Sequence, residues 1–278
     1  HAVDPPKFQS GALQTTMNHE LRHLSCSKHG VDCWEKQEFM TSENTTLLNG
    51  RVKLRQSLEG LRASMDSVLL AAAVKAKTGE SILDMGCGTG AVGLCAHERL
   101  KHLSLSLTGI DVQDKMIAIA RGNATDNGVQ GEYIIGDVAD KSLFKAEAFD
   151  HIVMNPPYYT KGERLQSPDP AREAAYTGDL EIWIGSALHW LKQGGSLSII
   201  HRADALNDIL FYAQRKFGAI EVWPIHSKPN DPAIRVIVKM VRNRKTPLTM
   251  HPPIVMFDDE GNPSLKSNSI LRDGMGLV

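Results

Sequence analysis

The sequence predicts an α/β protein built on a doubly wound, Rossmann-like sheet of seven strands, mostly parallel, with an antiparallel hairpin at one edge. Between residues 81 and 225, short apolar runs alternate with single helical segments, a pattern that produces parallel strands. The last two apolar runs, 220–225 and 234–241, are joined by a loop alone, as in an antiparallel pair. A glycine-rich turn at 86–90 follows the first strand of the series, where such sheets bind nucleotide cofactors.

The chain leads into this sheet through a hairpin and a helix. Asn49-Gly50 stands between apolar residues and predicts a hairpin within residues 47–60. Residues 65–74 are rich in leucine and alanine, which are good helix formers, so a helix is expected there.

The alternating elements then follow in order. Runs of β-branched and other apolar residues predict the strands, helix formers predict the helices, and Gly194-Gly195 marks a break before one strand. The expected strands are residues 81–85, 105–111, 132–135, 149–154, 196–200, 220–225 and 234–241, and the expected helices are 91–100, 115–127, 179–191 and 203–216.

We divide the chain into three parts on this pattern: an N-terminal extension (1–46), the domain (47–245) and a proline-punctuated tail packed on the domain (246–278). The extension contains four residue types that can bind zinc, namely His23, Cys26, His29 and Cys33. They form one loose run without the tight Cys-x-x-Cys pairs of structural zinc sites, so we favour a solvated extension and expect no metal.

The bulk composition limits the classes of protein that remain. No run of about 18 apolar residues is present, and the first 30 residues lack the apolar core of a signal peptide, so we expect no membrane span and no secretion. Four cysteines in 278 residues fit a reducing, cytoplasmic location better than a disulfide framework. With a net charge of −1, any contact with RNA requires a local basic patch.

The glycine turn is suited to a nucleotide-containing cofactor. Gly86, Gly88 and Gly90 follow a strand and precede a helix, where glycine allows positive φ and the helix N-terminus offers free N–H groups. Because Gly86-x-Gly88-x-x-Ala91 also fits the dinucleotide fingerprint, the glycines alone do not separate NAD from S-adenosylmethionine.

Acidic residues at three successive strand ends favour S-adenosylmethionine. Asp84 lies where a carboxylate can anchor a cationic amino group and would repel a pyrophosphate. Asp111, about 20 residues further on, is placed to bind a ribose diol, and Asp137 to accept from an adenine amino group. The alternative is that these acids only cap helices that follow the strands.

The tetrapeptide Asn155-Pro156-Pro157-Tyr158 ends the strand at 149–154 and predicts chemistry at a conjugated amino nitrogen. The Asn155 side-chain oxygen and the Pro156 carbonyl can accept both amino hydrogens, which frees the nitrogen lone pair. Two prolines stiffen the loop, and the Tyr158 ring can stack on a base. The alternative is an ordinary turn.

These motifs resemble class I S-adenosylmethionine-dependent methyltransferases that methylate amino groups. The segment 62–70 and the run from Asn155 to Tyr159, continuing to Ala171-Arg172-Glu173, further resemble the bacterial tRNA(Val) adenine-N6 methyltransferase family. The similarity covers roughly residues 47–245.

The resemblance implies roles for individual residues. It implies that the catalytic residues are Asn155, Pro156 and Tyr158. It implies that S-adenosyl-L-methionine contacts Asp84, Gly86, Cys87, Gly88, Gly90, Asp111, Val112, Asp137, Val138 and Asn155. It implies that the substrate, tRNA, contacts Tyr158, Tyr159, Lys161, Arg164, Arg172, Arg62 and Asp66. Cys87 is expected to be a small filler in the turn rather than a reactive thiol.

Two basic segments could form a phosphate track beside the catalytic loop. The first holds Lys161, Arg164 and Arg172, and the second holds Lys228, Lys239, Arg242, Arg244 and Lys245. The alternative is scattered solubilising charge. Trp183 and Trp190 are expected to be core residues.

The sequence therefore predicts methylation of the N6 amino group of an adenine in tRNA. A protein-glutamine N5 methyltransferase remains open, because a glutamine amide poses the same lone-pair problem. A small-molecule methyltransferase and a non-catalytic or NAD-binding Rossmann module also remain. The sequence does not distinguish a monomer from a homodimer.

Overall fold

The computed structural model describes residues 42–57, 65–157 and 180–277. Predictions that concern other residues, including the His23–Cys33 cluster, lie outside the described part. The elements in chain order are β1 (Ser42–Leu47), β2 (Val52–Ser57), α2 (Met65–Ala72), β3 (Ser81–Met85), α3 (Ala91–Arg99), η2 (Lys101–Leu103), β4 (Ser106–Asp111), α4 (Asp114–Asp126), β5 (Gly131–Ile135), η3 (Lys141–Leu143), β6 (Phe149–Met154), α6 (Leu180–Trp190), β7 (Leu191–Arg202), η4 (Ala203–Ala205), α7 (Leu206–Ala213), β8 (Phe217–His226), β9 (Ala233–Arg242), β10 (Thr249–Met250), β11 (Ile254–Val255) and α8 (Leu265–Leu271).

The central sheet has the strand order β10-β8-β9-β7-β6-β3-β4-β5, with β11 also paired to β8. Neighbouring strands are parallel except β9, which is antiparallel to both β7 and β8. The predicted fold class is confirmed, because the seven predicted strands form the sheet and β8 and β9 form the antiparallel pair. The tail adds two short strands, β10 and β11, parallel to β8.

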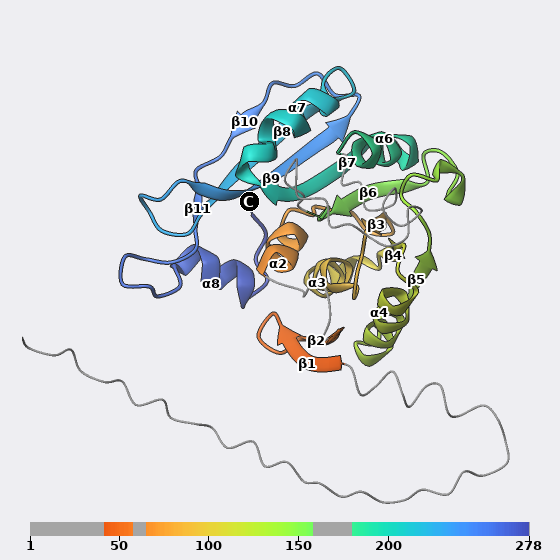
Figure 1. Ribbon diagram of the computed structural model, residues 1–278, viewed down its shortest axis with the longest axis horizontal. Coiled ribbons are helices and arrows are strands. Elements are labelled where there is room, and N and C mark those ends of the chain that lie inside the picture. Colours follow the sequence, from red (N-terminus) through yellow and green to blue (C-terminus); the bar gives the residue numbers. More distant parts are fainter. Residues whose placement is uncertain (1–41, 58–64, 158–179, 278) are drawn as a thin grey trace, which may run out of the picture. The chain divides into compact units, whose positions relative to one another are not determined.

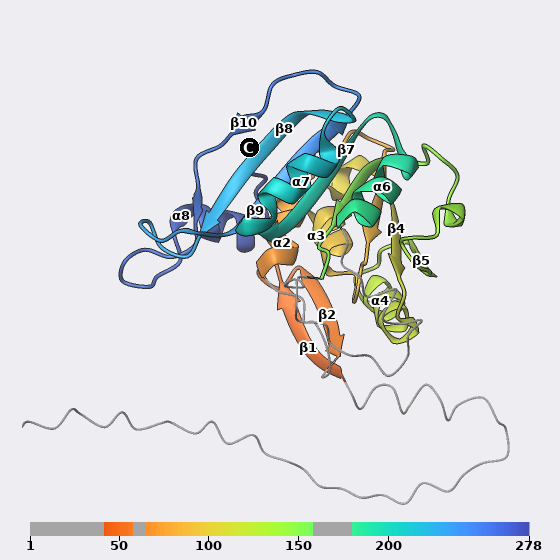
Figure 2. The ribbon, with the colours of Figure 1, turned by 45° about the horizontal axis from the view of Figure 1, so that its top comes forward.

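Helices cover both faces of the sheet (Figures 1 and 2). One apolar cluster contains residues of α2, α3, α4 and α8, and of the β1–β2 hairpin, on one face. The second contains residues of α6 and α7 on the other face. Strand residues alternate between the two clusters, as Ile82 and Leu83 of β3 do, because successive side chains of a strand point to opposite faces.

The register of the parallel strands aligns the ends that carry the predicted motifs. Met85, the last residue of β3, pairs with Met154 of β6 and with Ile110 of β4. The residues that follow Met85, Met154 and Ile110 therefore lie at the same level of the sheet. These residues are Gly86, Asn155 and Asp111. We call this side of the sheet, where the parallel strands end, the carboxyl edge.

Several predicted boundaries were wrong by two or more residues, and two of the largest disagreements come from an irregularity of a strand or from a different helix type. β7 begins at Leu191 rather than 196, because residues 192–195 form an irregularity opposite Asp150 of β6. Gly195 is required there, since a Cβ would lie 2.7 Å from the Asp150 carbonyl oxygen. The helix predicted at 203–216 is η4 followed by α7, which ends at Ala213.

The last residues of the chain pack against α2 and α3 on one face of the sheet. Leu277 is buried, and its N–H donates to the Ala72 carbonyl at the end of α2 (3.0 Å). Arg99 of α3 donates to the carbonyls of Gly274 (2.9 Å) and Ala71 (2.5 Å). The division of the chain into extension, domain and tail stays a prediction.

Candidate active site

The glycine turn has the backbone conformation that its sequence predicts. Gly86, Gly88 and Gly90 all have positive φ (66°, 52° and 82°). A Cβ on Gly88 would meet no atom within 4 Å, whereas a Cβ on Gly86 would lie 2.5 Å from the Trp183 ring of α6. The turn is open at Gly88 and closely covered at Gly86, so glycine is required at these two positions for different reasons.

Asp84 is buried beneath the turn, and its carboxylate accepts a hydrogen bond from the Gly93 N–H of α3 (2.9 Å). The pKa of Asp84 is raised to about 7, mainly by burial and in addition by the charge of Asp111, against the lowering effect of that bond. A cationic group beside Asp84 would favour the ionised form. Within the described residues, the environment of Asp84 therefore favours the neutral acid.

Asp111 links two parts of the site. One carboxylate oxygen accepts from the Gly88 N–H and the other from the Gln113 N–H, both at 2.9 Å. Burial raises the pKa of Asp111, although these backbone bonds oppose the shift. An ionised carboxylate has about four acceptor positions, so Asp111 can still accept from a diol.

Asp137 is a partly buried residue beyond the end of β5. Its side chain accepts from the Ala139 N–H two residues on (2.8 Å). Asp137 and Asp111 thus make local turn bonds of the kind the capping alternative describes, but neither is the N-cap of a described helix. Val112 is 44% exposed and Val138 is 9% exposed, so they offer apolar surface beside the two acids.

Cys87 is buried in the turn, and burial raises the pKa of its thiol well above the usual range, as do the charges of Asp84 and Asp111. Its N–H donates to Ile110 O (2.9 Å) and its carbonyl accepts from Gly90 N (2.8 Å). A buried protonated thiol agrees with the predicted filler role.

Asn155 and Pro156 begin at the end of β6, level with Gly86, with Pro156 buried and Asn155 partly buried. The remaining predicted residues of the catalytic loop and its surroundings lie outside the described residues. These are Tyr158, Tyr159, Lys161, Arg164, Arg172 and Arg62.

Asp66 lies near the carboxyl edge, where its carboxylate pairs with Arg235 of β9 (3.2 Å). Arg235 stands opposite Arg202, the last residue of β7. Asp66 is therefore an ion-paired residue beside the end of β7, and its predicted substrate contact stays a prediction.

Most of the second basic segment lies away from Asn155, so the prediction of a single phosphate track there was wrong. Val241 pairs with Ser196 of β7, six residues before the end of that strand, so Arg242, Arg244 and Lys245 lie toward the opposite edge from Asn155. Lys228 differs, because it lies in the loop between β8 and β9, on the side where β7 ends. Arg242 pairs there with Glu147 (3.1 Å). Lys239 is buried within the sheet. Antiparallel β9 carries its carboxyl end away from the site.

Three residues near the turn were not predicted to take part in it. Trp183, expected to be core, covers Gly86. Tyr133 of β5 lies beneath the turn: a Cβ on Gly109 would be 2.6 Å from its ring, and its buried hydroxyl makes no hydrogen bond within the described residues. Asn123 of α4 donates to the Thr89 carbonyl (2.9 Å). Asn123 alone had a sequence signal, since asparagine is a poor residue for a helix interior.

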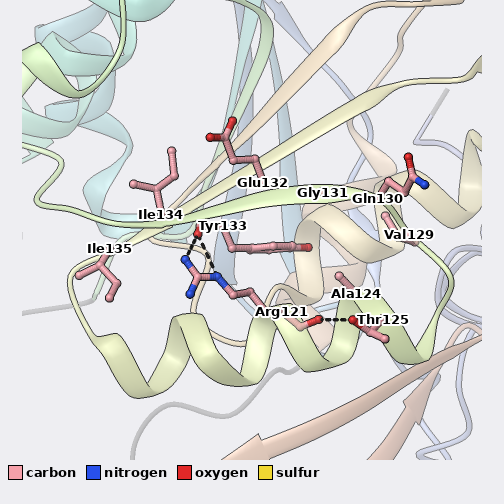
Figure 3. A pocket seen from close by; sticks show the side chains of 10 residues that line it. All are labelled: Arg121, Ala124, Thr125, Val129, Gln130, Gly131, Glu132, Tyr133, Ile134 and Ile135. Atoms are coloured by element: carbon pink, nitrogen blue, oxygen red, sulfur yellow. Dashed lines mark hydrogen bonds between the residues drawn. The ribbon is translucent and has the colours of Figure 1, made fainter.

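A hollow of about 690 Å³ lies along the outer edge of β5 and the facing side of α4 (Figure 3). Arg121 donates to the Tyr133 carbonyl (3.2 and 2.6 Å) and so satisfies one outward-facing group of this edge strand. The hollow is lined by none of the strand-end acids or the glycine turn. The chemistry points to the carboxyl edge instead.

The chain is similar in sequence to known methyltransferases. The family described as "Methyltransferase small domain" matches residues 62–227. A "tRNA1(Val) (adenine(37)-N6)-methyltransferase" from Phocaeicola vulgatus is 31% identical over 183 residues, covering 64% of this chain and 76% of that protein. A "Release factor glutamine methyltransferase" from Chlamydia trachomatis is 33% identical over 89 residues, covering 32% of this chain and 29% of that protein.

The solved structures support the fold. The crystal structure of a predicted O-methyltransferase from Agrobacterium tumefaciens has a TM-score of 0.64 at 25% identity, covering 77% of this chain and 98% of that chain. No helix in residues 42–57, 65–157 or 180–277 is long and apolar enough to cross a membrane.

Proposed function

Because the chain belongs to the methyltransferase small-domain family, we propose that it methylates the N6 amino group of an adenine in tRNA. It is an S-adenosylmethionine-dependent methyltransferase, as its family and fold show. The observation that carries the substrate proposal is the level alignment of Gly86 and Asn155 at the ends of paired strands, because it sets an acceptor for an amino group beside the cofactor turn.

The residues present suit S-adenosylmethionine. Asp84 is a buried acid whose ionised form a cationic group would favour, Asp111 has acceptor capacity for a diol, and the open side of Gly88 allows close approach to the backbone. Val112 and Val138 offer apolar surface for the adenine, with Asp137 beside them. When bound, the cofactor supplies a methyl group already activated by its sulfonium.

The protein's task is then to position an amino nitrogen and expose its lone pair. The Asn155 side-chain oxygen and the Pro156 carbonyl accept the two amino hydrogens, which opposes delocalisation of the lone pair into the ring. Pro156 and Pro157 restrict φ and hold these acceptors in place. No general base with a shifted pKa is required, so the rate gain comes from positioning and preorganised acceptors.

The relatives favour RNA over protein as the substrate. The match to the relative named as a tRNA adenine-N6 methyltransferase covers about three quarters of that protein, whereas the match to the glutamine methyltransferase covers less than a third. A tRNA substrate agrees with the cytoplasmic location expected from composition.

The test is transfer of labelled methyl from S-adenosylmethionine to total tRNA and, separately, to a protein fraction with ribosomes and release factors. We expect label in tRNA that digests to N6-methyladenosine and falls at least a hundredfold in Asn155→Ala. Asn207→Ala, at an exposed position on α7, is the matched control and retains activity. Label found in protein alone would make the enzyme a glutamine methyltransferase.

A further inference from the structure

Two asparagines, Asn123 of α4 and Asn127 at the C-cap of that helix, bind the backbone of β2 in the same way. Asn127 accepts from the Lys53 N–H (2.9 Å) and donates to the Lys53 carbonyl (2.7 Å). Asn123 accepts from the Arg55 N–H (2.7 Å) and donates to the Arg55 carbonyl (3.0 Å). On the side of β2 that faces away from β1, each side-chain amide therefore makes the two hydrogen bonds that a peptide group of another strand would make.

The spacing of the two elements explains why the contacts repeat. Four residues of an α-helix rise about 6 Å, and two residues of a β-strand rise about 6.6 Å. Asn123 and Asn127 are four apart on one helix face, and Lys53 and Arg55 are two apart on one strand edge. The Arg55 side chain adds an ion pair with Asp126 (2.6 Å).

The two asparagines differ in one contact. The Asn123 side chain is fully buried and also donates to the carbonyl of Thr89, between Gly88 and Gly90 of the cofactor turn (2.9 Å). The second donor contact of Asn127 goes instead to the Asn123 carbonyl within α4 (2.7 Å). Only Asn123 joins the hairpin to the turn.

This contact fixes the orientation of one peptide group in the turn. The Thr89 carbonyl is held by Asn123, and the Gly90 N–H of the same peptide unit donates to the Cys87 carbonyl (2.8 Å). Two residues upstream, the Gly88 N–H donates to the Asp111 carboxylate. Because glycine allows many conformations, a turn with three glycines depends on such contacts to keep one shape.

We propose that Asn123 is a positioning residue for cofactor binding, and that through it the docking of the β1–β2 hairpin and the binding of S-adenosylmethionine are thermodynamically coupled. A turn held in its bound shape has a higher affinity, because less conformational freedom is lost on binding. By linkage, a cofactor that stabilises the turn also stabilises the hairpin by the same factor. The proposal holds for any methyl acceptor.

The experiment compares Asn123→Leu with the matched control Asn127→Leu, using S-adenosylhomocysteine as the probe in calorimetry. We expect Asn123→Leu to weaken binding about tenfold and Asn127→Leu to remain within twofold of the wild type. In turnover, Asn123→Leu should raise KM for S-adenosylmethionine and leave kcat within a factor of two. Equal weakening in the two variants would overturn the proposal.

A second readout is amide hydrogen exchange at Lys53 and Arg55, measured with and without saturating S-adenosylhomocysteine. The probe should slow exchange at Arg55 in the wild type and in Asn127→Leu, but not in Asn123→Leu. Equal slowing in all three proteins would also refute the coupling.

If Asn123→Leu does not fold, Asn123→Asp replaces it. An aspartate keeps the acceptor for the Arg55 N–H but has no donor for the Thr89 carbonyl. We expect this variant to retain protection of the Arg55 amide and still bind the probe about tenfold more weakly. Wild-type affinity in Asn123→Asp would show that the Thr89 contact does not position the turn.

Discussion

At the residue scale, the site contains an acid whose environment disfavours its charge. Asp84 is buried, accepts a hydrogen bond from the Gly93 N–H, and interacts unfavourably with a second carboxylate, Asp111. Such perturbed groups often mark functional sites, because binding supplies the missing partner. The buried hydroxyl of Tyr133 also makes no hydrogen bond within the described residues. Burial is the main cause that raises the pKa of Tyr133, and the charge of Asp84 raises it further.

The raised pKa of Asp84 predicts how stability depends on pH without cofactor. The folded protein binds a proton at Asp84 up to about pH 7, whereas the unfolded chain releases it near pH 3.8. The contribution of Asp84 is therefore fully present below about pH 4 and is lost as pH rises to about 7. A shift of this size corresponds to about 4 kcal/mol as an upper figure.

Asp84→Asn should flatten this dependence, because an amide does not titrate and can still accept from Gly93 N–H. Urea unfolding between pH 4 and 8 measures the effect, and the variant should also lose affinity for S-adenosylhomocysteine. An identical pH slope in the two proteins would contradict the assignment.

At the element scale, polar side chains join the starts of three neighbouring strands, at the edge opposite the site. Asp150 of β6 accepts from the N–H and hydroxyl of Ser81 (3.0 and 2.8 Å) and from Lys192 of β7 (2.8 Å). His151 bridges Ser196 and Glu80, both at 2.8 Å. These contacts fix the positions of β3, β6 and β7 along one another. They therefore also fix the relative positions of the opposite strand ends, where the site lies.

Asp150→Asn should lower the free energy of unfolding at pH 7 by about 1 kcal/mol, because the ion pair with Lys192 is partly exposed. Burial alone would raise the pKa of Asp150, but hydrogen bonds from Lys192 and Ser81 outweigh it and lower the pKa. The stabilisation is thus present above about pH 4 and is lost as pH falls further.

Thermal unfolding at pH 7 and pH 3 should show a larger difference between wild type and variant at the higher pH. Lys192→Met removes the same ion pair, so the double variant should lose little more than either single one. Fully additive losses would show that the two residues act independently.

At the scale of the whole molecule, the C-terminal residues contact helices that lie far away in the sequence. Arg99 of α3 donates to the Ala71 carbonyl of α2 and to the Gly274 carbonyl, while buried Leu277 donates its N–H to the Ala72 carbonyl. Burial lowers the pKa of Arg99, which nevertheless stays charged near neutral pH, since arginine titrates far above this range. The C-terminal residues thereby complete the face that carries α2 and α3.

Arg99→Met should lower the free energy of unfolding by about 2 kcal/mol, because the two carbonyls lose a charged donor in a largely buried place. Arg51→Met is the matched control: Arg51 also binds a tail carbonyl, that of Arg272, but at an exposed position, and its loss should cost less. Urea unfolding measures both. A larger loss in Arg51→Met would reverse the ranking.

The sequence by itself determined the features that depend on neighbours along the chain. The alternation of strands and helices, the glycine turn and the prolines after β6 were all predicted, because hydrophobic period and backbone preference act locally. Asp84, Asp111, Asp137 and Asn155 were predicted as strand-end residues for the same reason.

The tertiary structure alone decided which strand ends become neighbours. β3 lies between β4 and β6, which sets Gly86 beside Asn155, while the reversed direction of β9 carries Arg242 to the far edge. The positions of Trp183, Tyr133 and Asn123 at the turn likewise follow from long-range packing. Strand order, register and side-chain contacts depend on which distant surfaces bury one another, and no local pattern contains that information.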